Sequence, residues 1–498
     1  MGAAMTDVIT SATRPRDTSQ PSRLRSQWPA VAFAAVLIAG TALRLWKLRT
    51  SPAWQWDEGV YWRVAANMQH GVLAEHPVFG APWEPFLYQP PLYFLMVARW
   101  FDLIGASIYH ARILGIAFTA GMQALLFWLL SKLHGPRIAL LAVVPVVFDA
   151  WLLYIGRVSY IENALMLLVV GALLLYQAAL ERPSWQRFAL AGFAAGFTAG
   201  FKQTGAYVIL TILLCWLITR RENRGHIILV AAAAAVIVVY VLVMVRLYNL
   251  PGRPWFTDQS LVQVRRILGL QRSGGTLTTP DGALHLLEAQ YRYFVISLTP
   301  GLVAFAVAAR RLWQCYWARD WAPVWPNALL FSWLAMGVAV FGLSSLKFPQ
   351  YFALILVPAY CYLWTEVARW EWRPMLKAVA AATAAVAGVG AFLLTIPAFS
   401  VNSLAATQSW TAAHVPARAV VVTEQSIGDL ITQRWCTVRK ADACVGVASY
   451  AITWRTYLQS SFDQGDRAFY QLMRGATAVR SFTGVAGTAT VWKLRRAP

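Results

Sequence analysis

Two adjacent carboxylates, Asp57 and Glu58, follow the first long apolar run of the chain in the stretch WQWDEGVYW, residues 54–62. Acidic residues are scarce, since 22 Asp and Glu stand against 43 Lys and Arg. A carboxylate can act as a general base on a hydroxyl group. It can also stabilise the N-terminus of a helix, where free N–H groups and the helix dipole favour negative charge. The motif alone leaves both roles open for Asp57.

Further ionisable residues lie near the ends of later apolar runs: Arg157 and Glu162 in GRVSYIENAL, Lys202 in AGFKQTGAY, and Lys347 in SSLKFPQYF. A Lys or Arg costs at least about 2.5–3.5 kcal/mol at the centre of a membrane helix and less near its ends. Snorkelling explains any one of these residues. It does not explain why carboxylates and cations gather at the same face of the membrane.

These residue types together suit one reaction class. Two or three carboxylates can activate a hydroxyl group, and two or three cations can hold a phosphate. The surrounding aromatic residues suit sugar rings and an interfacial lipid. The set favours transfer of a sugar from a lipid phosphate to an acceptor hydroxyl, with Trp56, Tyr61, Tyr88, Gln89 and Tyr351 as candidate substrate-lining residues.

The composition predicts a polytopic α-helical membrane protein. Of the 498 residues, 58% are hydrophobic and 13% are charged, against about 25% charged in soluble domains. The net charge of +21 does not favour nucleic-acid binding, because no recognition motif accompanies it. Basic residues also collect in the cytoplasmic loops of membrane proteins.

The apolar runs predict about eleven transmembrane helices, most of them near the length of a bilayer crossing. Two of them, 188–201 and 204–219, are short and contain glycines. With the N-terminus in the cytoplasm, the basic clusters fall in the inner loops, and the C-terminus lies outside a cytoplasmic membrane. Residues 1–27 are expected to be a disordered cytoplasmic tail, and residues 28–397 the transmembrane domain. The predicted spans are 28–46, 112–131, 138–156, 163–180, 188–201, 204–219, 226–247, 293–309, 325–343, 350–368 and 378–397.

Two segments are expected to be outer juxtamembrane helices. Residues 90–106 carry Arg99 and Asp102 in their middle, and a crossing there would move most basic clusters to the outside. In the stretch after Asp57, Val60, Val64 and Met68 recur at four-residue spacing. That pattern predicts an amphipathic helix lying on the membrane.

The tail, residues 398–498, is predicted to be a small extracytoplasmic α/β domain. ARAVVVTE, ATAVRSF and TATVWKL indicate strands, and SYAITWRTYL and DRAFYQLM indicate helices. Cys436 and Cys444 lie close together, and an oxidising compartment would let them form a disulfide.

Other polar residues are given structural roles. Asp149 could pair with Arg157 or face the site cavity, and the structural pair is favoured. Arg265 and Arg266 could reach a phosphate or a substrate, and a solvated face is favoured. The spacing of His70, Glu75 and His76 fits no standard metal signature. No cofactor is therefore predicted, and a divalent metal is not favoured.

The sequence resembles the C-type membrane glycosyltransferases that use polyprenyl-phosphate sugars, with bacterial lipid A aminoarabinose transferases and protein O-mannosyltransferases as the nearest groups. The resemblance covers roughly residues 28–370. It rests on the order of four motifs: the acidic WQWDEGVYW, the YQPPLYF segment, the acidic residue of SYIENAL, and KFPQY. One departure is Gln89, where family members often carry Lys before the Pro pair; this bears on phosphate contact and on the donor sugar.

The resemblance implies roles for five residues. Asp57 matches the catalytic acidic residue, the general base on the acceptor hydroxyl, and Glu58 matches a neighbour that organises the site. Glu162 matches the second acidic position. Lys202 and Lys347 match cations that neutralise the lipid phosphate, with Arg157 as a third candidate from its position. Direct displacement would invert the anomeric centre.

Two other function classes remain open at this point. A transporter or flippase of lipid-linked sugars would also carry ionisable groups in the membrane, although inverted repeats are typical of transporters. An envelope assembly protein could use the outer domain as a binding module. The donor sugar and the acceptor, whether glycan, lipid or protein, are not specified by the sequence.

Overall fold

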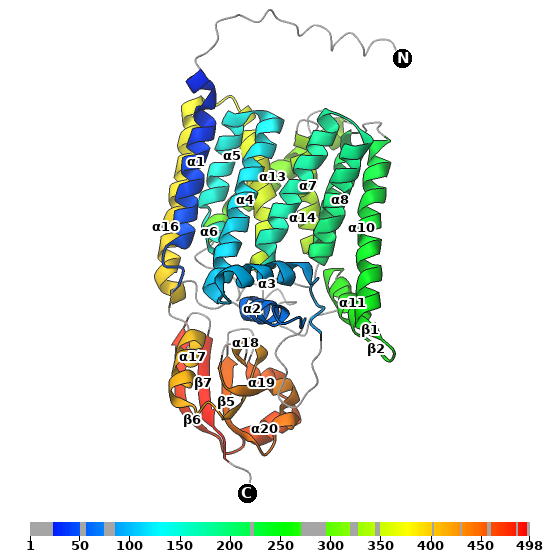
Figure 1. Ribbon diagram of the computed structural model, residues 1–498. Helices are drawn as coiled ribbons and strands as arrows, with labels where there is room; N and C mark the ends of the chain where they lie inside the picture. Colours follow the sequence, from blue (N-terminus) through cyan, green and yellow to red (C-terminus); the bar gives the residue numbers. More distant parts are fainter. Residues whose placement is uncertain are drawn as a thin grey trace, which may run out of the picture.

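The computed structural model describes residues 23–49, 56–73, 85–219, 224–268, 270, 295–318, 327–343, 349–400, 403–428, 431–455, 460–484 and 487–495 (Figure 1). A helical bundle forms the larger part, and a smaller α/β domain lies beyond one end of it. The predicted disordered tail falls largely outside the described residues. The bundle helices are α1 (Arg23–Leu45), α4 (Ile108–His134), α5 (Pro136–Phe148), α6 (Ala150–Ile155), α7 (Ile161–Glu181), α8 (Trp185–Phe201), α9 (Tyr207–Thr219), α10 (Gly225–Tyr248), α13 (Val295–Ala318), α14 (Ala328–Leu343), α15 (Ala353–Arg369) and α16 (Pro374–Ser400).

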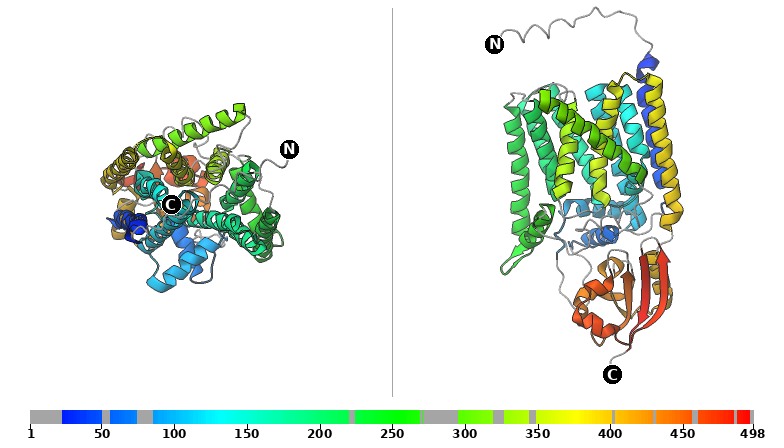
Figure 2. Two further views of the ribbon diagram at one scale, coloured as in Figure 1. Left: turned by 90° about the horizontal axis from the view of Figure 1, so that it is seen from above. Right: turned by 180° about the vertical axis from the view of Figure 1, so that it is seen from behind.

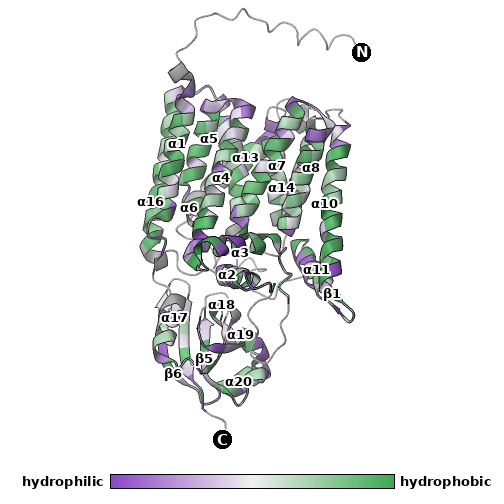
Figure 3. Cartoon of the chain, viewed as in Figure 1, coloured by the Kyte–Doolittle hydropathy of each residue, from purple (hydrophilic) through white to green (hydrophobic). Residues whose placement is uncertain are grey.

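The bundle has the surface of a multi-pass membrane protein. Within the described residues, α1, α4, α7, α10 and α16 are long and apolar enough to cross a bilayer, and shorter apolar helices accompany them. Apolar residues cover the bundle, and polar residues gather at its two ends (Figure 3). The predicted number of crossings stays a prediction.

The short, glycine-rich span α8 is explained by its packing. A Cβ atom at Gly192 would lie 2.2 Å from the carbonyl oxygen of Leu229, and one at Gly196 would lie 2.7 Å from that of Ala233. Both contacts are with α10, so the two helix backbones approach closely, as small residues allow in membrane proteins.

The predicted span 138–156 is wrong as one continuous helix, because α5 and α6 are separated at Asp149. The Asp149 Oδ1 atom accepts a hydrogen bond from the N–H of Leu152 at 2.8 Å, and Oδ2 accepts one from the Tyr360 hydroxyl at 2.6 Å. An Asp side chain that caps a new helix competes with continuation of the old one.

Three helices lie beyond the end of the bundle that faces the C-terminal domain: α2 (Trp56–Met68), α3 (Leu92–Ile104) and α11 (Trp255–Ile267) (Figure 1). The α3 helix lies across the bundle end, in the arrangement expected for 90–106. The expectation that α2 lies on the membrane is wrong in one respect. Its apolar face packs on α3, with the Tyr61 ring edge-on to the rings of Tyr93 and Phe94.

The C-terminal domain follows α16, which runs beside α1 (Figure 2). Its five-stranded sheet has the order β4-β3-β5-β7-β6. β4 and β5 pair parallel with β3, and the other pairings are antiparallel. The elements are α17 (Ser403–His414), β3 (Val420–Thr423), α18 (Gln425–Gly428), β4 (Arg434–Thr437), β5 (Ala448–Arg455), α19 (Ser461–Gln464), α20 (Arg467–Met473), β6 (Thr477–Gly484) and β7 (Gly487–Lys493).

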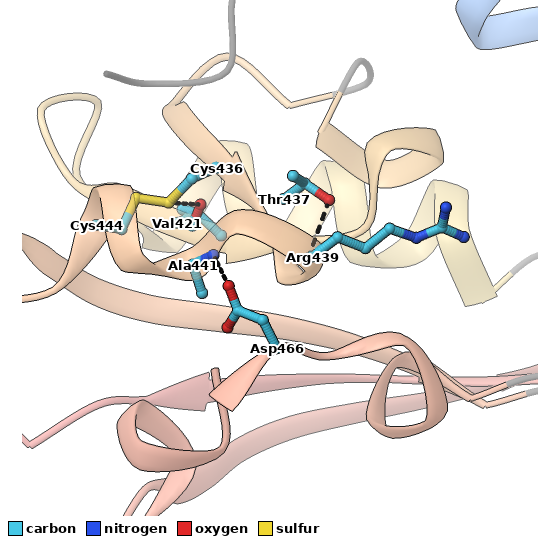
Figure 4. The surroundings of a disulfide bond; sticks show 7 residues. All are labelled: Val421, Cys436, Thr437, Arg439, Ala441, Cys444 and Asp466. Atoms are coloured by element: carbon cyan, nitrogen blue, oxygen red, sulfur yellow. Dashed lines mark hydrogen bonds between the residues drawn. A yellow bond between two sulfur atoms is a disulfide. The ribbon is translucent and has the colours of Figure 1, made fainter. Parts of the chain in front are cut away.

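The helix predicted for SYAITWRTYL is wrong, because residues Ala448–Arg455 form strand β5. This strand lies between β3 and β7. Ile452 and Trp454 pack on one face of the sheet and Ala451 on the other, so the alternation was hidden in a nearly continuous apolar run. Cys436 and Cys444 form a disulfide beside β3, where Asp466 accepts a hydrogen bond from the N–H of Ala441 (Figure 4).

Candidate functional site

Four residues from distant parts of the chain meet at the bundle end that faces the C-terminal domain. Asp57 lies in the first turn of α2, and Glu162 in the first turn of α7. Lys202 ends α8, and Tyr351 lies in the short helix η5 (Pro349–Phe352). Asp57 is close enough to Glu162 and Lys202 for both charges to change its pKa. Three of the predicted motifs thus form one site.

Glu162 and Lys202 form a buried ion pair. The distance from Lys202 Nζ to Glu162 Oε1 is 2.5 Å, and both side chains are at least 98% buried. The same Nζ atom lies 4.9 Å from the centre of the Tyr351 ring, a cation–π distance. Burial of a charged pair is costly unless its geometry is good, and here the short distance and the Tyr351 ring offset part of that cost.

Glu58 has a different environment from its neighbour. Its Oε1 and Oε2 atoms accept hydrogen bonds from Nε and Nη2 of Arg112 in α4, each at 2.8 Å. Oε1 also accepts the N–H of Ser159 at 3.0 Å. Successive helical residues point about 100° apart. Glu58 can therefore anchor α2 while Asp57 faces Glu162.

Asp57 has the electrostatics of a general base. Burial raises the pKa of this carboxyl to about 6, Glu162 acts in the same direction, and Lys202 opposes them. A base is most effective when its pKa lies near the working pH. The role of a simple helix cap would not require a second carboxylate nearby.

Aromatic residues border the carboxylates. Tyr61 is buried on α2, and the Tyr93 hydroxyl contacts Ser159 at 3.2 Å. Tyr88 is exposed, and its carbonyl oxygen accepts a hydrogen bond from Gln203 Nε2 at 3.3 Å. Gln89 Oε1 is buried and has no hydrogen-bond partner in the described part of the chain. The side chain of Trp56 lies outside what the structure describes.

The predicted phosphate-binding residues are not all placed. Lys347 lies outside the described residues. Arg157 is fully buried, donates to the carbonyl oxygen of Trp46 at 2.6 Å, and lies 5.3 Å from the ring of Phe392. Trp46 directly follows α1, and Phe392 lies in α16. The phosphate role of Arg157 stays a prediction.

Sequence reasoning missed Arg112. It lies at the predicted start of a span, where a buried arginine requires a carboxylate partner. The favoured solvated position of Arg266 is wrong, because this residue is only partly exposed and its charge acts on Tyr351. Its position in the last turn of α11 gives no local signal of this interaction.

No group of three or more His, Cys, Asp or Glu side chains suited to a metal ion occurs within the described residues. Glu75 and His76 lie outside them.

Comparisons with known proteins concern the fold and part of the sequence. The family model of dolichyl-phosphate-mannose-protein mannosyltransferases matches residues 88–246. The crystal structure of ArnT from Cupriavidus metallidurans bound to undecaprenyl phosphate is similar over 94% of this chain and 98% of that one, with a TM-score of 0.62 and 13% identity. The Archaeoglobus fulgidus oligosaccharyltransferase is similar over 87% of this chain and 70% of that one, with a TM-score of 0.56 and 13% identity. No curated protein sequence matches the chain.

The structural likeness extends over nearly the whole chain, and the family match covers Glu162 and Lys202. The chain therefore shares the fold of these membrane glycosyltransferases, and residues 88–246 also match the mannosyltransferase family model.

Proposed function

We propose that the protein transfers a monosaccharide from a polyprenyl-phosphate-linked donor to a hydroxyl acceptor. The observation that carries this proposal is the meeting of Asp57, Glu162, Lys202 and Tyr351 at one end of the bundle. The ArnT neighbour binds undecaprenyl phosphate, and an Archaeoglobus fulgidus neighbour was solved with dolichol phosphate. A ligand of that class suits a site at a membrane surface.

In the proposed reaction, Asp57 accepts the proton of the acceptor hydroxyl as its oxygen attacks the anomeric carbon. The bond from that carbon to the phosphate oxygen breaks, and the phosphate leaves with the electron pair. A phosphate leaving group needs no strong general acid. Attack opposite the leaving group inverts the anomeric centre.

Cations near the leaving phosphate would stabilise its developing charge. Lys202 is already paired with Glu162, and Asp57 adds a second carboxylate. These three residues together carry no excess positive charge, so they alone do not attract a phosphate. We assign the remaining positive charge to Arg266, beside Tyr351, and to Lys347 from its motif. Lys202 would keep its role through the Nζ hydrogens that Glu162 does not use.

The reaction is assigned to the outer face of the cytoplasmic membrane, with the N-terminus inside and the C-terminal domain outside. Two observations support this assignment. Helix α1 begins at the bundle end opposite the C-terminal domain (Figure 1), and the basic residues fall in the loops predicted to be cytoplasmic.

A transfer assay tests the proposal. Purified protein in detergent is supplied with a radiolabelled polyprenyl-phosphate sugar and an envelope extract as acceptor. Label should move from the lipid to a new product with wild-type protein and not with Asp57→Asn. In a second assay the protein is reconstituted into vesicles, where movement of intact donor across the bilayer without cleavage would instead indicate a flippase. Neither activity would favour an assembly role.

A further inference from the structure

The α11 helix is fixed firmly to the bundle. A short β-hairpin, β1 (Asn249–Leu250) with β2 (Arg253–Pro254), joins it to α10. Asn249 Oδ1 accepts the N–H groups of Phe256 and Thr257 at 3.0 and 3.2 Å. The buried ring of Phe256 packs edge-on against Tyr240 of α10. These contacts hold the first turn of α11 against the end of α10.

One side chain of α11 binds the main chain of the segment that joins α2 to α3. Gln259 Oε1 accepts the N–H of Leu87 at 2.6 Å, and Gln259 Nε2 donates to the carbonyl oxygen of Pro85 at 2.9 Å. A side-chain amide can accept a hydrogen bond from one main-chain N–H and donate one to a main-chain carbonyl at the same time. It then pairs with the main chain in the way that a neighbouring strand would. The loop and the helix are more than 170 residues apart in sequence.

The segment held in this way continues into the site. Gln203, next to Lys202, donates to the carbonyl oxygen of Tyr88, so the main chain is fixed on both sides just before Gln89. Arg266 lies seven residues after Gln259. Two helical turns separate them, and they share one side of α11. The same side of α11 therefore takes part in two interactions. Gln259 binds the main chain within residues 85–88, and the charge of Arg266 acts on Tyr351.

We propose that Gln259 is a positioning residue that holds the 85–89 segment against α11, so that Tyr88, Gln89 and Arg266 meet the lipid-phosphate donor as one surface. This inference rests on the proposed function for its kinetic consequence only. Gln259 touches main-chain atoms and takes no part in the chemistry. Its removal should weaken donor binding more than it slows the chemical step, because Asp57 is held separately by the contacts of Glu58.

Hydrogen exchange tests the contact without any activity. The peptide spanning 86–89 should exchange faster in Gln259→Met, which has a similar volume and makes neither hydrogen bond. Gln259→Glu keeps the acceptor for Leu87 and should retain more protection. Leu261→Met is the control, since this exposed side chain lies on the opposite side of α11 and the change keeps its volume. Unchanged exchange in Gln259→Met would overturn the proposal.

Donor binding tests the consequence. Titration with a synthetic polyprenyl phosphate should give about a tenfold weaker Kd in Gln259→Met, the effect of roughly 1.4 kcal/mol, and an unchanged Kd in Leu261→Met. In the transfer assay, KM for the donor should rise while kcat changes little. Faster exchange with an unchanged Kd would show that the hydrogen bonds of Gln259 only stabilise the fold. That result would overturn the positioning role. If wild-type protein transferred no sugar, the proposed function would fail, and exchange and binding would still decide the role of Gln259.

Discussion

Glu58 of α2 and Arg112 of α4 form a two-pronged ion pair in which both N–O distances are 2.8 Å and both side chains are at least 96% buried. The same carboxylate accepts the Ser159 N–H just before α7. Glu58 therefore joins three elements, and it fixes the adjacent Asp57 relative to Glu162 at the start of α7. Glu58 anchors α2 and Asp57 faces Glu162, and these separate positions account for two neighbouring carboxylates in a chain with few acidic residues.

Glu58→Gln should destabilise the protein by about 3–5 kcal/mol, the usual cost of leaving a buried charge without its partner. Replacement of both partners by Met should recover much of this loss, because no buried charge remains. Thermal unfolding in detergent measures both effects. Asp102→Asn, which removes an exposed pair with Arg99 on α3, is the control and should change stability little. Equal effects in the two variants would show that the buried pair does not anchor α2.

Asp57→Asn should lower kcat/KM by about 10²–10⁴-fold, the typical contribution of a general base, while unfolding temperature and donor binding stay near wild type. The side chain keeps its size and loses only its ability to take a proton. Transfer of labelled sugar measures the loss, and a thermal scan serves as the folding check. Near-normal transfer would leave Asp57 as a structural residue at the start of α2.

The raised pKa of Asp57 predicts the acidic limb of the pH profile. The base is active when deprotonated, so kcat/KM should rise tenfold per pH unit below about pH 6 and level off above it. Lys202 opposes the rise in this pKa, so Lys202→Met should move the limb to higher pH. A profile flat from pH 5 to 8 would contradict a titrating base with this pKa.

Lys202→Met should also reduce transfer by about 100-fold or more, a barrier increase of roughly 2.7 kcal/mol. It leaves Glu162 without its partner beside Asp57 and removes the charge next to Tyr351. The double variant Lys202→Met/Glu162→Gln should regain stability but not activity. Lys132→Met is the matched control, because Lys132 pairs with Glu181 at 2.7 Å on the exposed surface. Full activity in Lys202→Met would assign the lysine to packing alone.

The sequence permitted prediction of the elements whose apolar runs are long, and of the acidic and basic residues at their ends. It did not predict partners that lie across the fold. The Glu58–Arg112 pair spans 54 residues, and the Gln259 contacts span more than 170; neither leaves a local pattern. Local pattern also failed at β5 and at Asp149. A central strand buried on both faces resembles an apolar helix, and one capping Asp divides an otherwise continuous apolar run.

The C-terminal domain should be outside the cell and oxidised. The structure joins Cys436 to Cys444, eight residues apart, and a closed loop of this size contributes roughly 2.5 kcal/mol in the chain-entropy estimate. Both cysteines should resist alkylation until a reductant is added, and reduction should lower the unfolding temperature of the domain. Ser481→Cys on the exposed strand β6 should react with a membrane-impermeant maleimide in intact cells. Gln186→Cys, at the expected inner end of α8, should react only after lysis. Labelling of the two positions in the reverse order would invert the proposed topology and would place the carboxylate site on the cytoplasmic face.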